Sequence, residues 1–166
     1  MKVAFATFAH MAAAHHYALE LEWTGNTGQG TSTYEGYSRA HVVRITGKPD
    51  LLGSADPMFR GDPALHNPED LLLAALSQCH LLTYLALCAR ARINVLSYRD
   101  RAEGILLLTK DGGGQFTEVV LRPEVGVADA GMLAKAQHFH GEVHKYCFIA
   151  RSVNFPVRCE AVVRAL

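Results

Sequence analysis

A long apolar helix is the feature that most constrains this chain. Residues 71–89 are almost continuously hydrophobic, and the sequence NPED at residues 67–70 precedes them. Asparagine is a good N-cap, proline suits the first helical position, and acidic side chains favour the positive end of the helix dipole. We therefore predict a helix from this point to about Arg92. Because its apolar residues surround it almost completely, we expect a sheet on one side and another surface on the other.

The apolar segment approaches membrane-spanning length, but Ser77, Gln78, His80 and Thr83 interrupt it and basic clusters do not flank both ends. We therefore expect a buried helix and no membrane partner. Lys plus Arg and Asp plus Glu each number 16, so the net charge is zero and provides no electrostatic reason to bind nucleic acid. The 166 residues predict a single domain over 1–166, in which 1–16 form an N-terminal extension.

Four cysteines indicate the compartment. Cys79, Cys88, Cys147 and Cys159 are too few and too widely spaced for a disulfide scaffold. The short apolar run near the start is interrupted by His10 and does not resemble a signal peptide. We therefore expect a reducing, cytoplasmic location.

The remaining pattern predicts strands and a second helix. Asp129 can cap a helix in which Met132, Ala136, Phe139 and Val143 form an apolar stripe. Alternating or apolar runs bounded by turn residues predict strands over residues 17–23, 38–45, 95–108, 116–127 and 157–163. The expected fold class is α+β, with antiparallel sheets, a long central buried helix and a second helix.

Two of the four cysteines lie in polar interruptions. Cys79 stands between Gln78 and His80 in the apolar helix, and Cys147 ends the stripe of the second helix. Both thiols could border one cleft, although sequence spacing alone does not pair them. Cys88 falls on the opposite helix face and Cys159 is in phase with apolar strand positions, so both are expected to be inert core residues.

These motifs resemble a known family. The sequences NPEDLLLAA at 67–75, SQCH at 77–80, HKYCFIA at 144–150 and SVNFPV at 152–157 carry the resemblance. They are similar to the superfamily of osmotically inducible protein C (OsmC) and organic hydroperoxide resistance (Ohr) proteins. The resemblance covers roughly residues 17–163 and is closer to the OsmC-like branch, since Phe-Ile-Ala follows the second cysteine.

The resemblance implies an intertwined homodimer that reduces organic hydroperoxides to alcohols. Cys79 would be the peroxidatic cysteine and Cys147 the resolving one, joined as a disulfide that an external dithiol or lipoyl-type reductant reduces. Glu69 would orient an arginine beside the thiol. Arg39 is our choice for that arginine, with Arg44 as the substitute. The family implies no cofactor.

The implied chemistry makes physical demands on the chain. Only a thiolate attacks the O–O bond, so a cysteine in apolar surroundings needs a cation, and a guanidinium stays charged when desolvated. Glu69 and Cys79 are 79 − 69 = 10 residues apart, or roughly 15 Å on a straight helix, and cannot share one arginine directly. Either the helix is broken or two chains complete the site.

The same residues are also compatible with other functions. Cys79-His80 with His144-x-x-Cys147 offers four metal ligands, but helix neighbours point about 100° apart, so we expect no metal site. A non-catalytic stress or small-ligand-binding protein on the same fold is the alternative to the peroxidase.

Apolar side chains are expected to form the walls of the substrate pocket, and they would favour alkyl or lipid-like hydroperoxides. The residues expected in these walls are Leu72, Leu76, Leu82 and Phe148.

Overall fold

The computed structural model describes residues 14–166, which divide after Leu65 into two compact units. Residues 1–13, most of the expected N-terminal extension, lie outside the described part of the chain. The first unit contains all of the predicted N-terminal strands. The second contains both helices and the four cysteines.

The first unit is a three-stranded antiparallel sheet in the order β1-β2-β3. Its strands are β1 (Glu20–Trp23), β2 (His41–Arg44) and β3 (Leu51–Gly53), followed by a short 3-10 helix (Pro57–Phe59). β1 and β2 are shorter than predicted because the chain between them leaves the sheet as a loop. Trp23 closes this loop, since its indole donates to the carbonyl of Ser38 at 2.8 Å.

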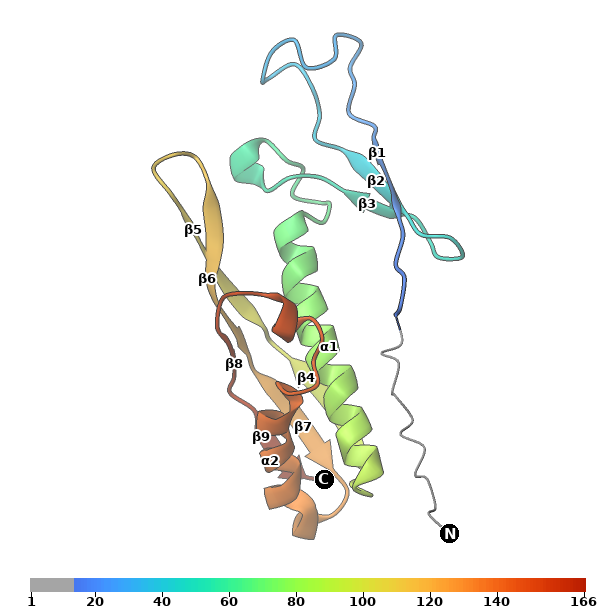
Figure 1. The fold of residues 1–166 in the computed structure, drawn as a ribbon, viewed down its shortest axis with the longest axis vertical. Helices are drawn as coiled ribbons and strands as arrows, with labels where there is room; N and C mark the ends of the chain where they lie inside the picture. The colour runs from blue at the N-terminus through green and yellow to red at the C-terminus, as the bar shows by residue number, and fades with distance from the viewer. Residues whose placement is uncertain (1–13) are drawn as a thin grey trace, which may run out of the picture. The chain divides into compact units, whose positions relative to one another are not determined.

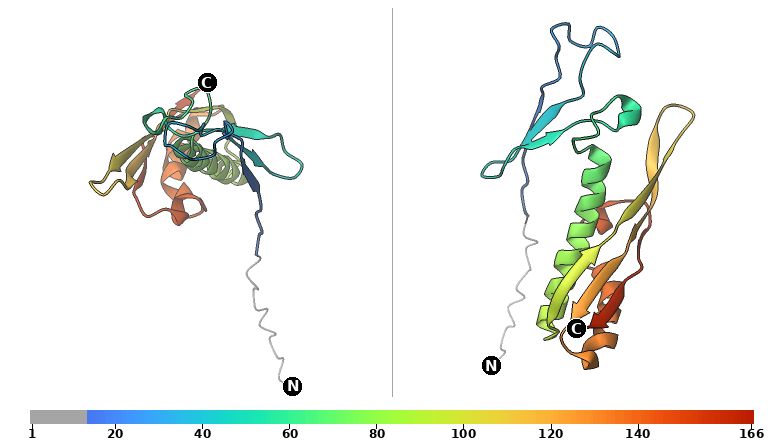
Figure 2. Two further views of the ribbon diagram at one scale, coloured as in Figure 1. Left: turned by 90° about the horizontal axis from the view of Figure 1, so that it is seen from above. Right: turned by 180° about the vertical axis from the view of Figure 1, so that it is seen from behind.

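The second unit combines two helices with six strands. The helices are α1 (Pro68–Arg90) and α2 (Leu133–Val143), with 3-10 helices at Ala130–Met132 and Ala150–Ser152. The strands are β4 (Val95–Asp100), β5 (Glu103–Leu108), β6 (Gly114–Leu121), β7 (Pro123–Val127), β8 (Val157–Cys159) and β9 (Val162–Ala165). Figures 1 and 2 show α1 lying alongside these strands. The α+β fold class is confirmed.

Helix α1 begins where the sequence predicts. The Asn67 side chain accepts a hydrogen bond from the backbone of Asp70, and the Asp70 carboxylate accepts one from the backbone of Asn67. This reciprocal capping box satisfies two amide groups at the helix start. The helix ends at Arg90, before the predicted Arg92, because Arg92 adopts a left-handed conformation with φ 59°.

The six strands form two sheets, in the orders β4-β7-β9 and β5-β6-β8. Three runs expected as single strands each break and pass from one sheet to the other, between β4 and β5, β6 and β7, and β8 and β9. At the breaks, Asp100 accepts a hydrogen bond from the backbone of Arg122, and Glu160 donates its backbone N–H to Leu121. These hydrogen bonds join residues that are distant in the sequence and hold the three breaks together. The local sequence pattern does not predict them.

Strand direction also differs from the expected arrangement. The β5–β6 hairpin is antiparallel around a turn in which Gly112 has φ 86°, a left-handed conformation that favours glycine. β6–β8 and β7–β9, in contrast, run parallel. Parallel neighbours need a long crossover, and the segment containing α2 provides it.

Helix α1 packs into the core on one face. Leu76, His80, Tyr84 and Cys88, spaced by four residues, are its buried positions. Tyr84 and Cys88 pack with α2 and β7, whereas Leu76 packs with β6. By length and apolar composition α1 could also cross a membrane, but in this unit it supplies core side chains. Its other face carries half-buried and exposed residues such as Leu82, which is 66% exposed.

Candidate functional site

Two cysteines from distant parts of the second unit are in contact. The Sγ atom of Cys147 lies 2.6 Å from the Sγ atom of Cys79, although 68 residues separate them. Cys79 is half-buried midway along α1, and Cys147 is buried in the turn after α2. Both are free thiols. The pairing that sequence spacing left open is therefore a direct contact.

The turn after α2 fixes the position of Cys147. Its backbone N–H donates to the carbonyl of Val143 at 2.9 Å, and its carbonyl accepts from the backbone N–H of Arg151 at 3.1 Å. The backbone N–H of Ala150 points at the Cys147 sulfur at 3.4 Å. Burial raises the pKa of the Cys147 thiol to about 11. At neutral pH this thiol is protonated, held in place and shielded from solvent.

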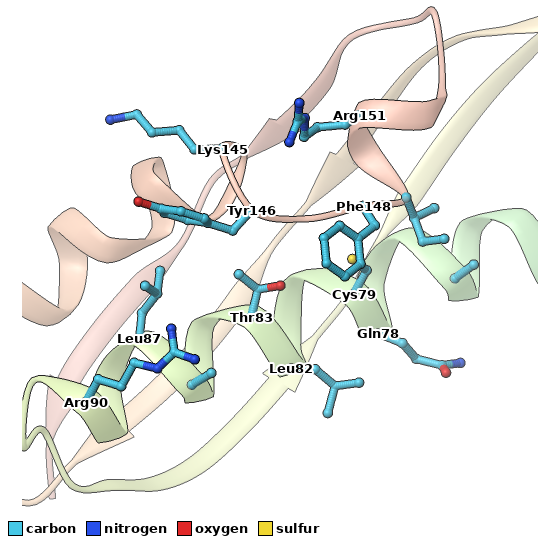
Figure 3. A pocket seen from close by; sticks show the side chains of 13 residues that line it. Gln78, Cys79, Leu82, Thr83, Leu87, Arg90, Lys145, Tyr146, Phe148 and Arg151 are labelled. Carbon is cyan, nitrogen blue, oxygen red and sulfur yellow. The ribbon is translucent and has the colours of Figure 1, made fainter. Parts of the chain in front are cut away.

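Cys79 opens onto a groove of about 710 Å³ that runs along α1. Figure 3 shows the groove between α1 and the segment after α2, with the Phe148 ring beside the Cys79 sulfur. The lining is mostly apolar or aromatic and includes Leu82, Leu87, Tyr146, Phe148 and Ile149. A molecule in this groove can reach Cys79, whereas Cys147 lies behind it.

The expected apolar walls are only half correct. Leu82 and Phe148 line the groove, as predicted. Leu72 and Leu76 do not, because they pack with β6 in the core on another side of α1. The apolar residues around α1 serve different neighbours, and composition alone does not distinguish them.

Three cations line the groove, and the sequence predicted none of them as the cation of the site. They are Arg90 at the end of α1, Lys145 after α2 and Arg151 beyond Cys147 (Figure 3). Lys145 is held by the Glu142 carboxylate at 2.8 and 2.9 Å. Among residues 14–166, Arg90 and Arg151 make no ion pair, so their charges are not neutralised by a carboxylate.

The predicted arginine lies in the first unit. The Arg39 guanidinium sits over the rings of Tyr34 and Tyr37, at 4.4 and 4.1 Å from their centroids. It also donates to the carbonyls of Tyr37 at 2.6 Å and Tyr34 at 2.8 Å. The substitute, Arg44, is engaged by the carboxylates of Glu22 and Asp50. Of the two arginines, Arg39 is the one without a carboxylate partner among residues 14–166.

Glu69 lies in the first turn of α1, half-buried. The helix runs unbroken from Pro68 to Arg90. The helical rise between Glu69 and Cys79 is therefore roughly 15 Å. The structure thereby excludes a broken helix as the way to bring them together. Within one chain, these two side chains do not share one arginine.

His80 faces away from its sequence neighbour Cys79. It is buried, and its Nε2 lies 2.9 Å from Nδ1 of His140 and 3.6 Å from Sγ of Cys159. The four potential metal ligands in the sequence, Cys79, His80, His144 and Cys147, are therefore not brought together. His80 faces away from Cys79, and His144 is exposed. Sequence analysis missed the His80–His140–Cys159 cluster, although His140 does fall on the buried face of α2.

Burial also sets the charge of the two histidines. Removal from water lowers the pKa of His80 to about 4, partly offset by the negative charge of Asp100. Burial, followed by the neighbouring His80, lowers the pKa of His140 to about 3. Both imidazoles are neutral at pH 7, and one ring donates a hydrogen bond to the other.

The chain is similar to known proteins in both sequence and structure. Residues 61–161 match the model of a family described as OsmC-like protein. An OsmC-like protein of unknown function from Vibrio cholerae is 34% identical, with a TM-score of 0.79 over 90% of this chain and 100% of that one. The uncharacterized protein YmaD of Bacillus subtilis is 26% identical over 92% of this chain and 97% of its own length.

More distant structures have the same fold. An organic hydroperoxide resistance protein OsmC from Legionella pneumophila is 17% identical, with a TM-score of 0.66 over 92% of this chain and 98% of that one. The family match covers more than half of the chain and includes both cysteines and the groove. The chain therefore belongs to the OsmC-like protein family.

Proposed function

We propose that this protein is a thiol-dependent peroxidase that reduces organic hydroperoxides to alcohols. The observation that carries the proposal is the contact between Cys79, which is open to an apolar groove, and the shielded Cys147. An accessible thiol beside a buried second thiol is the arrangement that a peroxidatic and a resolving cysteine require. The organic hydroperoxide resistance proteins of the same fold support it.

The proposed reaction has two steps on the protein. The Cys79 thiolate attacks the terminal peroxide oxygen, so an S–O bond forms, the O–O bond breaks and the alkoxide leaves as the alcohol after taking a proton. The Cys147 thiolate then attacks the Cys79 sulfenic acid; an S–S bond forms, the S–O bond breaks and water leaves. An external dithiol, of the dithiothreitol or lipoyl kind, reduces the disulfide.

The groove favours organic over hydrogen peroxide. Its lining of leucine and aromatic side chains can bury an alkyl group next to Cys79, and this burial contributes roughly 0.8 kcal/mol per CH₂ group. Hydrogen peroxide has no such group to bury. The substrate class is therefore alkyl or lipid-like hydroperoxides.

We further propose that the active form is an intertwined homodimer in the cytoplasm. The outer face of α1 exposes apolar side chains, and zero net charge provides little repulsion between copies. Because α1 is unbroken, an arginine that contacts Cys79 can form an ion pair only with the Glu69 carboxylate of another chain. Arg39, already positioned by two tyrosines, is the proposed cation, and two chains would form each site.

A peroxide consumption assay tests the function. The untagged protein is mixed with dithiothreitol or dihydrolipoamide, and the loss of cumene hydroperoxide, tert-butyl hydroperoxide and hydrogen peroxide is followed. We expect catalytic turnover with both organic peroxides and a lower kcat/KM for hydrogen peroxide. Groove binding of an apolar ligand without turnover would contradict the proposal and favour the non-catalytic alternative.

A further inference from the structure

The second unit contains a group of metal-binding side chains outside the peroxidatic pair, of which two are buried and one, Cys159, is half-buried. His80 comes from α1, His140 from α2 and Cys159 from β8, and their ligand atoms all lie within 4.8 Å of one another. Both histidines are 5% exposed. Three elements that are distant in sequence thus bring two imidazoles and one thiol to the same point of the core.

We propose that His80, His140 and Cys159 form a binding site for a borderline-soft divalent ion, Zn²⁺ in the first instance. Two neutral imidazoles and a thiolate are ligands that zinc accepts, with Zn–N near 2.0–2.1 Å and Zn–S near 2.3 Å. Tetrahedral geometry with these lengths puts two nitrogens about 3.3 Å apart and nitrogen and sulfur about 3.6 Å apart.

The observed distances are close to those that the ion requires. The Nε2 atom of His80 lies 3.6 Å from Sγ of Cys159 and 2.9 Å from Nδ1 of His140. To bind zinc, the two nitrogens must separate by about 0.4 Å. The third pair, Nδ1 of His140 and Sγ of Cys159, lies within 4.8 Å, and zinc requires about 3.6 Å between them.

The ring of His140 is oriented by packing rather than by other hydrogen bonds. Tyr84 stacks on it with centroids 3.9 Å apart and 11° between the planes. Within the described part of the chain, its Nε2 atom is buried without a hydrogen-bond partner. The stacking fixes the plane of the ring, and Nδ1 faces His80 at 2.9 Å, so Nε2 can carry the proton while Nδ1 binds the metal.

A fourth ligand position is available beside the cluster. A small cavity of about 30 Å³ is lined by all three side chains. A polar cavity of this size can hold one water molecule, which would complete the tetrahedron. Cys147 lines the same cavity, so the metal site lies on the inner side of the thiol pair.

The charges around the cluster also suit a cation. Binding requires Cys159 to lose its proton to solvent, and one imidazole must move its proton to the ring nitrogen that faces away from the metal. Zinc with one thiolate keeps a net charge of +1, and the negative charge of Asp100 acts on both His80 and Cys159. Asp100 makes no ion pair among residues 14–166, so its charge is available to offset the metal.

Zinc binding to the untagged protein tests the proposal without any activity measurement. Bound zinc is counted by elemental analysis after gel filtration, and affinity is measured by competition with a chromophoric chelator. The double variant Cys79→Ser/Cys147→Ser is the background, because it removes the peroxidatic thiols as ligands. We expect one zinc per chain in the wild type and in this background.

Single substitutions locate the ion. Cys159→Ala and His140→Leu in that background should each weaken zinc binding by at least a hundredfold. Cys88→Ala, a buried cysteine on α1 outside the cluster, and His15→Ala/His16→Ala should leave binding unchanged. Unchanged affinity in Cys159→Ala, or loss of zinc when the exposed histidines are replaced, overturns the assignment.

Cobalt provides a readout that needs no substitution within the His80–His140–Cys159 cluster. Co²⁺ in the same site should give a thiolate-to-metal charge-transfer band in the Cys79→Ser/Cys147→Ser protein, because Cys159 is the proposed sulfur ligand. Absence of that band, with circular dichroism showing a folded protein, also overturns the proposal.

Discussion

The Cys79 and Cys147 sulfur atoms are 2.6 Å apart, yet only Cys79 opens onto the groove. The two thiols therefore differ in access rather than in proximity. In the proposed reaction, a peroxide that enters the groove reaches Cys79 first, and the sulfenic acid formed there lies next to Cys147. The different roles proposed for Cys79 and Cys147 can be tested by replacing one cysteine at a time.

Replacing Cys79 by serine should abolish peroxide turnover, because a serine hydroxyl supplies no comparable nucleophilic anion at neutral pH. Turnover with an organic hydroperoxide and dithiothreitol is the measurement. Cys88→Ala is the matched control, since Cys88 lies on the same helix but is fully buried against the core. Substantial activity in Cys79→Ser would show that the nucleophile is assigned to the wrong residue.

Replacing Cys147 by serine should leave one round of reaction intact and stop the second step. With one equivalent of peroxide, Cys79 should accumulate as sulfenic acid and be labelled by dimedone, which mass spectrometry detects. The wild type should be labelled far less, because its disulfide forms first. Equal labelling of both proteins would mean that Cys147 does not resolve the intermediate.

Disulfide formation should accelerate with pH. Burial raises the pKa of Cys147 to about 11, so its thiolate fraction rises about tenfold per pH unit over the range below that value. Stopped-flow measurement of the disulfide after a single peroxide addition, between pH 6 and pH 9, should show this slope. Peroxide loss followed in the same samples isolates the first step. A pH-independent rate of disulfide formation would refute the prediction.

Asp100 should contribute measurably to the stability of the second unit. Its carboxylate accepts from the Ser77 hydroxyl at 2.5 Å and from the backbone of Arg122 at 2.7 Å. Asp100→Ala leaves both donors without this acceptor, and the expected loss is about 1–3 kcal/mol in the free energy of unfolding by urea. The exposed Asp50 is the control, since Asp50→Ala removes only a surface ion pair with Arg44. Equal effects of the two substitutions would show that Asp100 has no special structural role.

The protein should sediment as a homodimer of the 18.1 kDa chain at micromolar concentration, with two active sites at the interface. A charge on the exposed apolar face of α1, introduced by Leu82→Glu, should cause loss of folding rather than clean dissociation, because the proposed homodimer is obligate. Lys110→Glu, in the β5–β6 turn, is the charge control. A folded, active monomer would contradict both the assembly and the shared site.

Local signals in the sequence predict the start of α1 and the β5–β6 turn. Asn67 caps the helix through its neighbour Asp70, and Gly112 supplies the positive φ of the turn, so a few adjacent residues contain all the information. The strand breaks were not predictable in this way. They depend on Asp100 bonding to Arg122, a contact between residues 22 apart in the sequence.

The candidate site shows the same division. Family resemblance singled out Cys79 and Cys147, and the structure brings them together. The cluster of His80, His140 and Cys159 went unnoticed, because Cys159 falls in phase with apolar strand positions and its partner His80 is 79 residues away. A periodic pattern reports which face of an element is buried, but not which buried polar groups meet.

The parallel strand pairs imply an order in which the chain folds. Val119 of β6 pairs with Val157 of β8, and Val125 of β7 pairs with Val163 of β9. Each of these pairings joins residues that are 38 positions apart in the sequence. Long closures are slower than the local closure of the β5–β6 hairpin, which is therefore expected to form first. The contact between Cys79 and Cys147 also joins residues 68 positions apart, so it is expected to form after the hairpin. A newly synthesised chain is thus expected to keep these two thiols apart while its first strands pair.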